Sequence, residues 1–394
     1  MNWPLVKLED IFEIARGGSP RPIADYITEE EDGLNWISIK DASNSEKYIT
    51  TTKLKIRKEG LKKSRLVKEG DFLLTNSMSF GRPYIMKTTG CIHDGWLVLS
   101  SDSKVVNQDY FYHLLGSPFL HRIFSKLAAG AVVKNLNIDL VKNVEIPLPS
   151  VEEQKQIAEI LDAADSLRQK DQLLIGHYER LSQSLFLGMF GDPVSNPMGW
   201  EALCLEDMVD FLTSGSRGWA KYYSDCGDVF IRIQNVGKNE LLLDDITYVD
   251  APDSAESKRT AVQTGDILLS ITADLGRTAV IPKEFPKAYI NQHLALIRLK
   301  KGYNPDYVSE FIASEGGKRQ FMKLDKGGVK AGLNFTDIKS LKLLNPPVSL
   351  QNQYMNNVKK IKEQKLLAEE SLIKSNDLFN SLLHRAFKGE LTVS

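Results

Sequence analysis

Short runs in which polar and apolar residues alternate fill much of the first 150 residues. Residues 36–40 and 72–75 are two such runs, and glycine, proline, asparagine and serine interrupt them, as at residues 17–20 and 81–83. Alternation with a period of two between such breakers predicts β-strands joined by turns. Because helical spacing appears near residues 110–127, this part of the chain is expected to be a mixed α+β domain.

A different pattern begins at Val151. From there to about Phe190 there is no proline, and apolar residues recur at helical spacing. Two heptad positions carry them, one with Ile157, Ala164, Tyr178 and Leu185 and the other with Ile160, Leu167, Leu174 and Leu181, with Asp171 as the polar exception. Residues 348–387 have a less regular stripe made of Val358, Ile361, Ala368, Leu372, Phe379 and Leu382. Each segment predicts a helix of about 40 residues, roughly 60 Å long.

An internal repeat relates the two halves of the chain. Asn137 and Asn334 lie 197 positions apart. The same offset aligns Trp3 with Trp200, Gly18 with Gly215, Phe124 with Phe321, Pro149 with Pro346, and Gln154 with Gln351. Since the match spans nearly the whole chain, both halves are expected to have the same fold.

Two long helices with one apolar stripe each can bury these stripes against each other. A two-fold relation between the halves would make the helices antiparallel. We therefore expect an α+β protein with two similar mixed α/β domains, at residues 1–150 and 192–347. Two long helices, at residues 151–191 and 348–394, would separate the domains and form an antiparallel coiled coil. Two amphipathic helices packed on separate domains are the alternative.

Charge and cysteine content add limits to this picture. The net charge is −1 and the pI is near 6.6, whereas an isolated DNA-binding domain usually has a basic excess. One dense basic stretch stands out, with Lys53, Lys55, Arg57, Lys58, Lys62, Lys63, Arg65 and Lys68. Such a balance suits a protein that binds DNA alongside partner subunits, and equally one that does not bind DNA. The three scattered cysteines predict neither disulfides nor a zinc site, and with no secretory signal they favour a cytoplasmic protein.

The end of each repeat has an ordered set of motifs. The first copy contains, in this order, Gly130, Leu136 with Asn137, and Ile-Pro-Leu-Pro at residues 146–149. Glu153 and Gln154 then follow at the start of the helix. The second copy has Gly327, Leu333, Asn334, Pro346, Pro347 and Gln351, with Leu350 in place of the glutamate. In this order the chain resembles, over its whole length, the specificity subunits of Type I restriction-modification systems.

The resemblance implies a non-catalytic protein that recognises DNA. Each target-recognition domain would read one half of a bipartite site, and the helices would set the unread spacer and dock two methylase (modification) subunits. S-adenosylmethionine, ATP and Mg would belong to the methylase and restriction subunits, with no cofactor or metal in this chain. One alternative is the specificity subunit of a Type IIB-like enzyme. Another is a duplicated protein-interaction scaffold, which would show no salt-dependent DNA binding.

Candidate DNA contacts lie on the expected loops, because loops after strands commonly carry binding residues. In the first domain the candidates for base contacts are Arg21, Lys40, Asn44, Asn76, Ser77, Ser79 and Arg82, and those for phosphates are Lys62, Lys63 and Arg65. In the second domain they are Arg217, Trp219, Arg232, Gln234, Asn235, Thr272, Asp274 and Arg277. Lys134 and Lys330 precede the closing Leu-Asn of each copy.

Two segments mimic catalytic motifs. Residues 345–348 read Asn-Pro-Pro-Val, but an adenine methyltransferase needs an aromatic residue at the last position to stack on the flipped base. Asp253, Glu256 and Lys258 mimic the metal-binding pattern of restriction nucleases, but their spacing leaves no room for a hairpin, so we expect a charged loop. There is neither a Walker-type phosphate loop nor an HExxH motif, and no catalytic site is expected.

Overall fold

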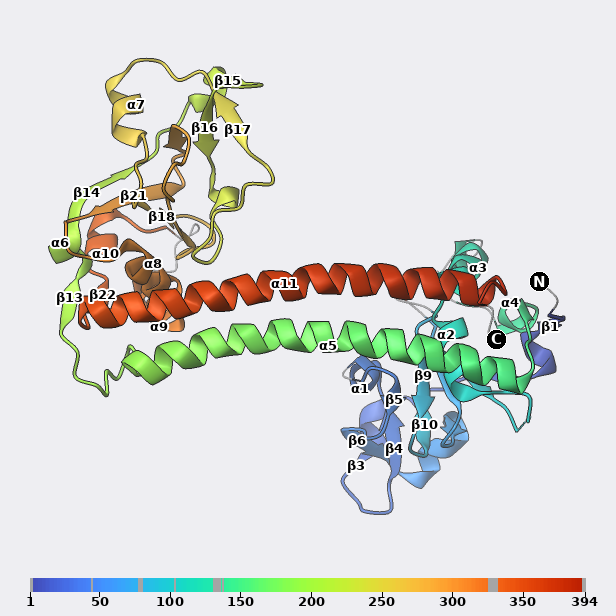
Figure 1. The fold of residues 1–394 in the computed structure, drawn as a ribbon. Helices are drawn as coiled ribbons and strands as arrows, with labels where there is room; N and C mark the ends of the chain where they lie inside the picture. The colour runs from blue at the N-terminus through green and yellow to red at the C-terminus, as the bar shows by residue number, and fades with distance from the viewer. Residues whose placement is uncertain are drawn as a thin grey trace. The chain divides into compact units, whose positions relative to one another are not determined.

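The structure is a computed structural model that describes residues 3–43, 45–76, 81–102, 104–129, 136, 138–324 and 332–391. Contacts divide the chain into two compact units (Figure 1), residues 1–173 with 368–394 and residues 174–367. The divisions fall inside the two long helices, α5 (Val151–Phe190) and α11 (Val348–Phe387). Each unit therefore combines one globular domain with a part of both helices.

Unit 1 is built on two five-stranded sheets, ordered β3-β6-β4-β10-β7 and β2-β11-β8-β9-β5, and the pair β1-β12. The strands are β1 (Leu5–Lys7), β2 (Glu13–Arg16), β3 (Ile27–Thr28), β4 (Leu34–Ile37), β5 (Tyr48–Ile49), β6 (Leu54–Ile56), β7 (Arg65–Val67), β8 (Phe72–Thr75), β9 (Pro83–Met86), β10 (Gly90–Ile92), β11 (Trp96–Ser100) and β12 (Glu145–Pro147). All four residues of β8 are buried, as are those of β9. These central strands form the middle of the domain core.

The helices of unit 1 are α1 (Ile39–Ser43), α2 (Gln108–Leu115), α3 (Pro118–Ala129) and α4 (Ile138–Lys142). Asn107 caps α2 by accepting a hydrogen bond from the backbone N–H of Tyr110. The helical stretch expected near residues 110–127 is two helices, because Gly116 ends α2 and Pro118 starts α3. The strand expected at 36–40 ends at Ile37, since the Asp41 carboxylate accepts from Ser38 N–H and starts α1.

Unit 2 repeats this plan with two four-stranded sheets, ordered β14-β21-β18-β19 and β15-β17-β16-β20, and the pair β13-β22. Its strands are β13 (Ala202–Cys204), β14 (Val209–Ser214), β15 (Tyr223–Ser224), β16 (Asp228–Ile231), β17 (Thr247–Val249), β18 (Ile267–Ser270), β19 (Thr278–Val280), β20 (Ala288–Ile290), β21 (Leu294–Leu299) and β22 (Lys342–Leu344). Its helices are α6 (Leu205–Met208), α7 (Ala255–Thr260), α8 (Pro305–Ala313), α9 (Glu315–Leu324) and α10 (Phe335–Lys339). The parallel pair β16–β20 corresponds to β4–β10, and the antiparallel pair β18–β21 to β8–β11.

One expectation for unit 2 was wrong. The segment predicted to be a charged loop contains helix α7, whose N-terminus is capped by the Ser254 hydroxyl accepting from Ser257 N–H. Glu256 accepts a hydrogen bond of 3.0 Å from Trp219 Nε1. The carboxylate therefore helps to hold a buried tryptophan in place.

The long helices pack against each other within each unit, in opposite directions. In unit 1, the Asp171 carboxylate accepts hydrogen bonds of 3.2 Å from the Ser371 hydroxyl, and the Arg168 guanidinium lies 4.5 Å from the ring centre of Phe379. Earlier residues of α5 thus meet later residues of α11. In unit 2, Glu179 pairs with Lys365 at 2.9 Å, while the Phe186 ring packs on Tyr354.

The end of one long helix completes the core of each domain. Phe387, near the end of α11, packs edge-on against Tyr110 of α2 with ring centres 5.8 Å apart. Phe190, at the end of α5, packs in the same way against Tyr307 of α8, at 5.2 Å. Since α11 belongs to the second repeat and α5 to the first, each domain takes core residues from the helix of the other repeat.

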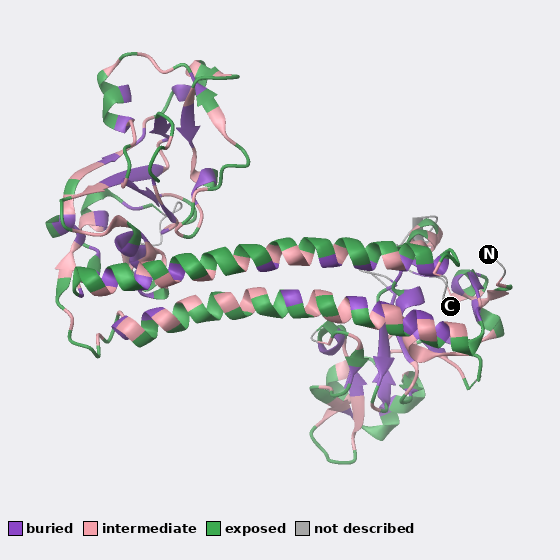
Figure 2. Cartoon of the chain, viewed as in Figure 1, coloured by how far each residue is buried: buried purple, intermediate pink, exposed green. Residues whose placement is uncertain are grey.

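The first of the two predicted heptad positions of α5 is more buried than the second. Ile157 and Ala164 are buried as expected, and so is the polar exception Asp171, whereas Tyr178, Leu185 and Ile160 are half-buried. Leu167, Leu174 and Leu181 are 45%, 41% and 50% exposed, which corrects the prediction that they lie in the helix seam. In unit 1, α5 also packs on its domain, so that Ala158 and Leu161, which lie outside both heptad positions, are buried in the domain core. Figure 2 shows exposed residues interleaved with half-buried ones along both helices.

Replacing Ser371 with alanine is expected to destabilise the helix pair of unit 1. The change removes the hydroxyl that donates to the two oxygens of the buried Asp171 carboxylate, and such a loss costs about 1–3 kcal/mol of unfolding free energy. Urea unfolding followed by circular dichroism measures the effect. Ser184→Ala, at an exposed position of α5, is the control, and equal midpoints for the two variants would contradict the prediction.

Candidate nucleic-acid interface

Loops far apart in the sequence converge in unit 1. The loop after β2 is tied to the turn between β10 and β11 by hydrogen bonds from Gly17 N–H to Trp96 O, 3.0 Å, and from Gly18 N–H to Ile92 O, 3.2 Å. The loop after β8 joins the same turn, where Asn76 N–H donates to Gly95 O at 2.9 Å. We call residues 17–21, 76, 81–82, 93–95 and 136 the first loop cluster.

Unit 2 has the same convergence. Gly215 N–H donates to Leu294 O at 3.2 Å, and Ile271 N–H donates to His293 O at 3.0 Å. Leu333 N–H closes the arrangement by donating to Ile271 O at 2.9 Å. Residues 215–217, 271–277, 291–293 and 332–333 form the second loop cluster. The loops of both clusters are thus joined by equivalent backbone hydrogen bonds. The two domains can therefore carry different side chains on the same backbone arrangement.

Glycine is required where these loops meet the turn. A Cβ atom on Gly17 would lie 2.0 Å from the His93 carbonyl oxygen, and one on Gly215 would lie 2.2 Å from the backbone of Asn291. No side chain fits at such distances. The two glycines therefore set the approach of the first loop in both clusters.

Asp94 organises the first loop cluster. Its carboxylate accepts a hydrogen bond of 2.7 Å from Ser19 and lies 3.4 Å from the Arg21 guanidinium, and its carbonyl accepts from Arg16 Nε at 2.8 Å. The Ser19 hydrogen bond holds the pKa of Asp94 below its usual value, although partial burial acts in the other direction. The Arg21 side chain remains 80% exposed. The cluster thus presents an oriented cation beside a fixed carboxylate.

His293 organises the second loop cluster. Its Nδ1 lies 2.8 Å from the Thr272 hydroxyl, and its Nε2 lies 2.9 Å from the amide nitrogen of Gln292. Arg259 donates to Ser214 O at 2.7 Å and to the Ser216 hydroxyl at 2.9 Å. Hydrogen bonds between side chains therefore cross from the turn to the loop after β18 in this unit.

Comparisons with known proteins decide the family. The family model for the Type I restriction modification DNA specificity domain matches residues 1–174 and 197–373. The chain belongs to this family. It is thus a DNA specificity subunit of a Type I restriction-modification system, and the family is non-catalytic and implies no cofactor in the chain.

Individual relatives align with this chain over nearly its full length. The MjaIX specificity subunit of Methanocaldococcus jannaschii is 24% identical, covering 100% of this chain and 94% of the relative. The EcoKI specificity subunit of Escherichia coli K12 is 23% identical, covering 99% of this chain and 89% of the relative.

Solved structures agree on the fold. A structure described in terms of complex assembly and conformational transition of the type I R-M system matches with a TM-score of 0.61 at 17% identity, covering 99% and 98% of the two chains. The S subunit from M. genitalium matches with a TM-score of 0.55 at 14% identity, covering 98% and 96%.

Most of the predicted contact residues of this specificity subunit are accessible. The exposed ones are Arg21, Lys40, Lys62, Lys63, Arg65, Arg82, Arg217, Gln234 and Asp274, whereas Arg232, Thr272 and Arg277 are half-buried. Asn44, Ser77, Ser79, Lys134 and Lys330 lie outside the described residues. Lys62 and Lys63 end the 3-10 helix η3 (Lys58–Lys63), and Gly18 packs on the Lys63 carbonyl, so this basic segment borders the first loop cluster.

Three predicted contact residues are buried. Asn76 has no exposed surface, and Trp219 is 4% exposed and stacks on Phe230 with ring centres 5.1 Å apart. Asn235 is 3% exposed, and its amide donates to the carbonyl oxygens of Leu242 and Asp245. These buried side chains support the loops from inside the domain.

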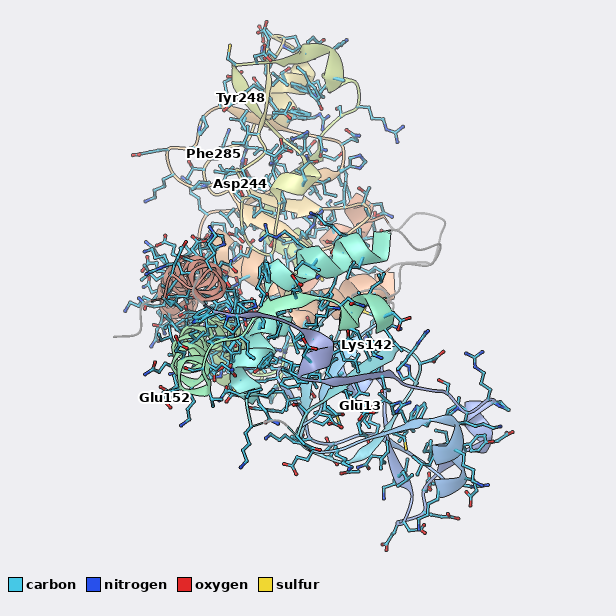
Figure 3. All side chains as sticks on the ribbon, turned by 90° about the vertical axis from the view of Figure 1, so that its right-hand side faces the viewer. Glu13, Lys142, Glu152, Asp244, Tyr248 and Phe285 are labelled. Carbon is cyan, nitrogen blue, oxygen red and sulfur yellow. The ribbon has the colours of Figure 1, made fainter. Side chains whose placement is uncertain are left out.

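Arg232 and Gln234 meet at one carboxylate. Both donate to Asp245 Oδ2 at 3.0 Å, next to Asp244, which Figure 3 labels. Arg277 likewise lies 3.2 Å from the Asp274 carboxylate. Arg232 and Arg277 are therefore each held by a carboxylate.

Sequence reasoning missed Asp94, Gln292 and His293 in the clusters, and also Arg16 and Arg259, two arginines that donate hydrogen bonds to them. The sequence does contain a pattern that marks the two turns in which Asp94 and Gln292 lie. Ile92-His93-Asp94 and Ile290-Asn291-Gln292 occupy matching places in the repeat, each as a short polar stretch between apolar strands. Comparing the two copies position by position would have singled out Asp94 and Gln292.

The segments that mimic catalytic motifs have structural roles in the described part of the chain. Residues 345–347 join β22 to α11, with Asn345 N–H donating to Glu201 O and Leu350 N–H to Pro347 O. Among the described residues no group of three or more His, Cys, Asp or Glu side chains could hold a metal ion. Over the same residues, no helix is both long enough and apolar enough to cross a membrane.

Trp219→Ala is expected to lower the stability of unit 2 by about 3–5 kcal/mol, because it leaves a cavity beside Phe230 and Tyr289. Arg217→Ala, at an exposed position, should change stability by less than about 0.5 kcal/mol. Hydrogen exchange in β16 and β20 measures both. Unchanged protection in the tryptophan variant would argue against its supporting role.

Proposed function

We propose that each domain of this specificity subunit reads one half of a bipartite DNA site. In this proposal residues 1–150 and 192–347 are the two reading domains. The observation that carries it is the pair of loop clusters, which share backbone hydrogen bonds but differ in side chains. Asp94 and Arg21 occupy the first cluster, and Gln292 and Thr272 the second. Different donors and acceptors on one scaffold suit two halves of unequal sequence.

The long helices would set the unread spacer. Each is a continuous helix of 40 residues, about 60 Å long at 1.5 Å per residue, whereas one turn of DNA is about 34 Å. Each domain core includes the end of a long helix. A change in helix length would therefore change the spacing of the two half-sites.

The same helices would dock two methylase subunits, with restriction subunits joining the complex. Large apolar residues are exposed along them, including Leu173 and Ile373 in unit 1 and Leu181, Leu366 and Leu367 in unit 2. Exposed apolar side chains in such numbers are typical of surfaces that bind protein partners. S-adenosylmethionine, ATP and Mg would be held by those partners.

Sequencing of methylated DNA tests the reading of DNA. Co-expression of this chain with a Type I methylase subunit is expected to produce methyladenine in a motif of two unequal halves around a fixed gap. Exchanging residues 198–347 for those of another specificity subunit should change only one half, because each domain has its own loop cluster. Absence of a bipartite motif from an intact complex would instead favour the interaction scaffold.

Lys62 and Lys63 are expected to bind phosphates, since both are exposed beside the first loop cluster. The double change to alanine should make the plot of log K against log salt shallower by about 2, at nearly one unit per lost phosphate contact. Titration of a labelled duplex at several salt concentrations gives the slope. Lys359→Ala with Lys360→Ala, two exposed positions of α11, is the charge-matched control, and equal slopes would remove the phosphate role.

A further inference from the structure

The turn between β20 and β21 has a backbone fixed on both sides. Asn291 is buried, its N–H donates to Ile231 O at 3.0 Å, and its side-chain oxygen accepts from His293 N–H at 3.2 Å. Leu294 N–H donates back to Asn291 O at 3.2 Å. Gln292 therefore stands, half-buried, on a rigid turn.

Hydrogen bonds also fix the side chain of Gln292. Its amide nitrogen lies 2.9 Å from His293 Nε2, and because an amide nitrogen can only donate, that ring nitrogen accepts. The other ring nitrogen, Nδ1, lies 2.8 Å from the Thr272 hydroxyl, so the imidazole links Gln292 to Thr272. Thr272 in turn sits in a β-bridge with Gly332. The amide plane is thus oriented without any ligand.

Part of the Gln292 amide is left for a partner. No hydrogen bond to its carbonyl oxygen is found among the described residues, and its second N–H is free of the histidine. An acceptor and a donor side by side match N6 and N7 of adenine in the major groove, to which glutamine binds in a bidentate manner. Orienting the amide in advance lowers the entropy cost of that contact.

The first domain carries a different group at the same place. Asp94 follows Ile92 of β10 as Gln292 follows Ile290 of β20, and both strands run parallel to the matching neighbour, β4 or β16. The Asp94 carboxylate is an acceptor only, bound to Ser19 and next to Arg21. This turn is therefore a place where the chemistry of the two domains differs while the backbone does not.

We propose that Gln292, held by His293 and Thr272, reads an adenine in the half-site bound by the second domain. The inference rests on the proposed function of that domain. Gln234 is the obvious competitor, because it is exposed and lies in the same unit. Its amide nitrogen, however, already donates to the Asp245 carboxylate at 3.0 Å.

Selection from a randomised duplex library tests the assignment, using the full chain co-expressed with a Type I methylase subunit. Gln292→Ala is expected to reduce the preference for one A·T pair by roughly tenfold to a hundredfold, the range for a bidentate base contact. All other positions of the motif should stay the same. Thr272→Val, which removes the hydroxyl that anchors His293, should weaken the same position by a smaller factor, about fivefold.

Gln292→Glu distinguishes a direct contact with the base from a role in maintaining the fold. A carboxylate at this position accepts only, so the preference should move from A·T to C·G at that one position, a gain that misfolding cannot produce. Gln263→Ala, at another exposed glutamine of unit 2, is the matched control and should leave the motif unchanged. The assignment is overturned if both Gln292 variants keep the parent motif, or if Gln234→Ala alters the adenine position instead. If the parent chain selects no bipartite motif, the proposed function itself fails, and the adenine contact with it.

Discussion

The exchange of helix ends between the two repeats is the contact on which the rest of the structure depends. Phe387 of α11 enters the core of the first domain beside Tyr110, and Phe190 of α5 enters the core of the second beside Tyr307. Both tyrosines are buried and use their hydroxyls to reach the strand that leads into a long helix, at Pro147 O and Leu344 O. Neither domain closes its apolar core with residues of its own repeat alone.

This arrangement couples stability to recognition. A domain whose core includes the end of a long helix cannot rotate freely about that helix, because aromatic rings would lose their packing. Loops carried by such a domain keep a defined direction relative to the helix. If the loop clusters bind DNA as proposed, this rigid support would hold their side chains in a fixed position for contact with the bases.

In the proposed recognition of DNA, the residues that support the loops are not the residues that would contact the bases. Gly17 and Gly215 let the loops approach the turns, and Trp219, Asn76 and Asn235 hold the loops from within. The side chains that differ between the two copies, such as Asp94 and Gln292, lie in the turns that these residues support. A duplicated gene can therefore change Asp94 or Gln292 without rebuilding the domain, whereas a change at either glycine would displace the backbone.

The sequence by itself determined the repeat, the two helices of 40 residues, the mixed α+β domains and the family, because periodicity and motif order are local properties of the chain. Only the tertiary structure decided which helix face is buried: Leu167, Leu174 and Leu181 share a heptad position but are 41–50% exposed, whereas Ala158 and Leu161, outside both heptad positions, are buried in the core of unit 1. It likewise decided that Trp219 is a core residue, through Phe230 and Glu256, and that Gln292 is held by His293 and Thr272. Burial and hydrogen-bond partners depend on residues distant in the chain, and no local pattern encodes them.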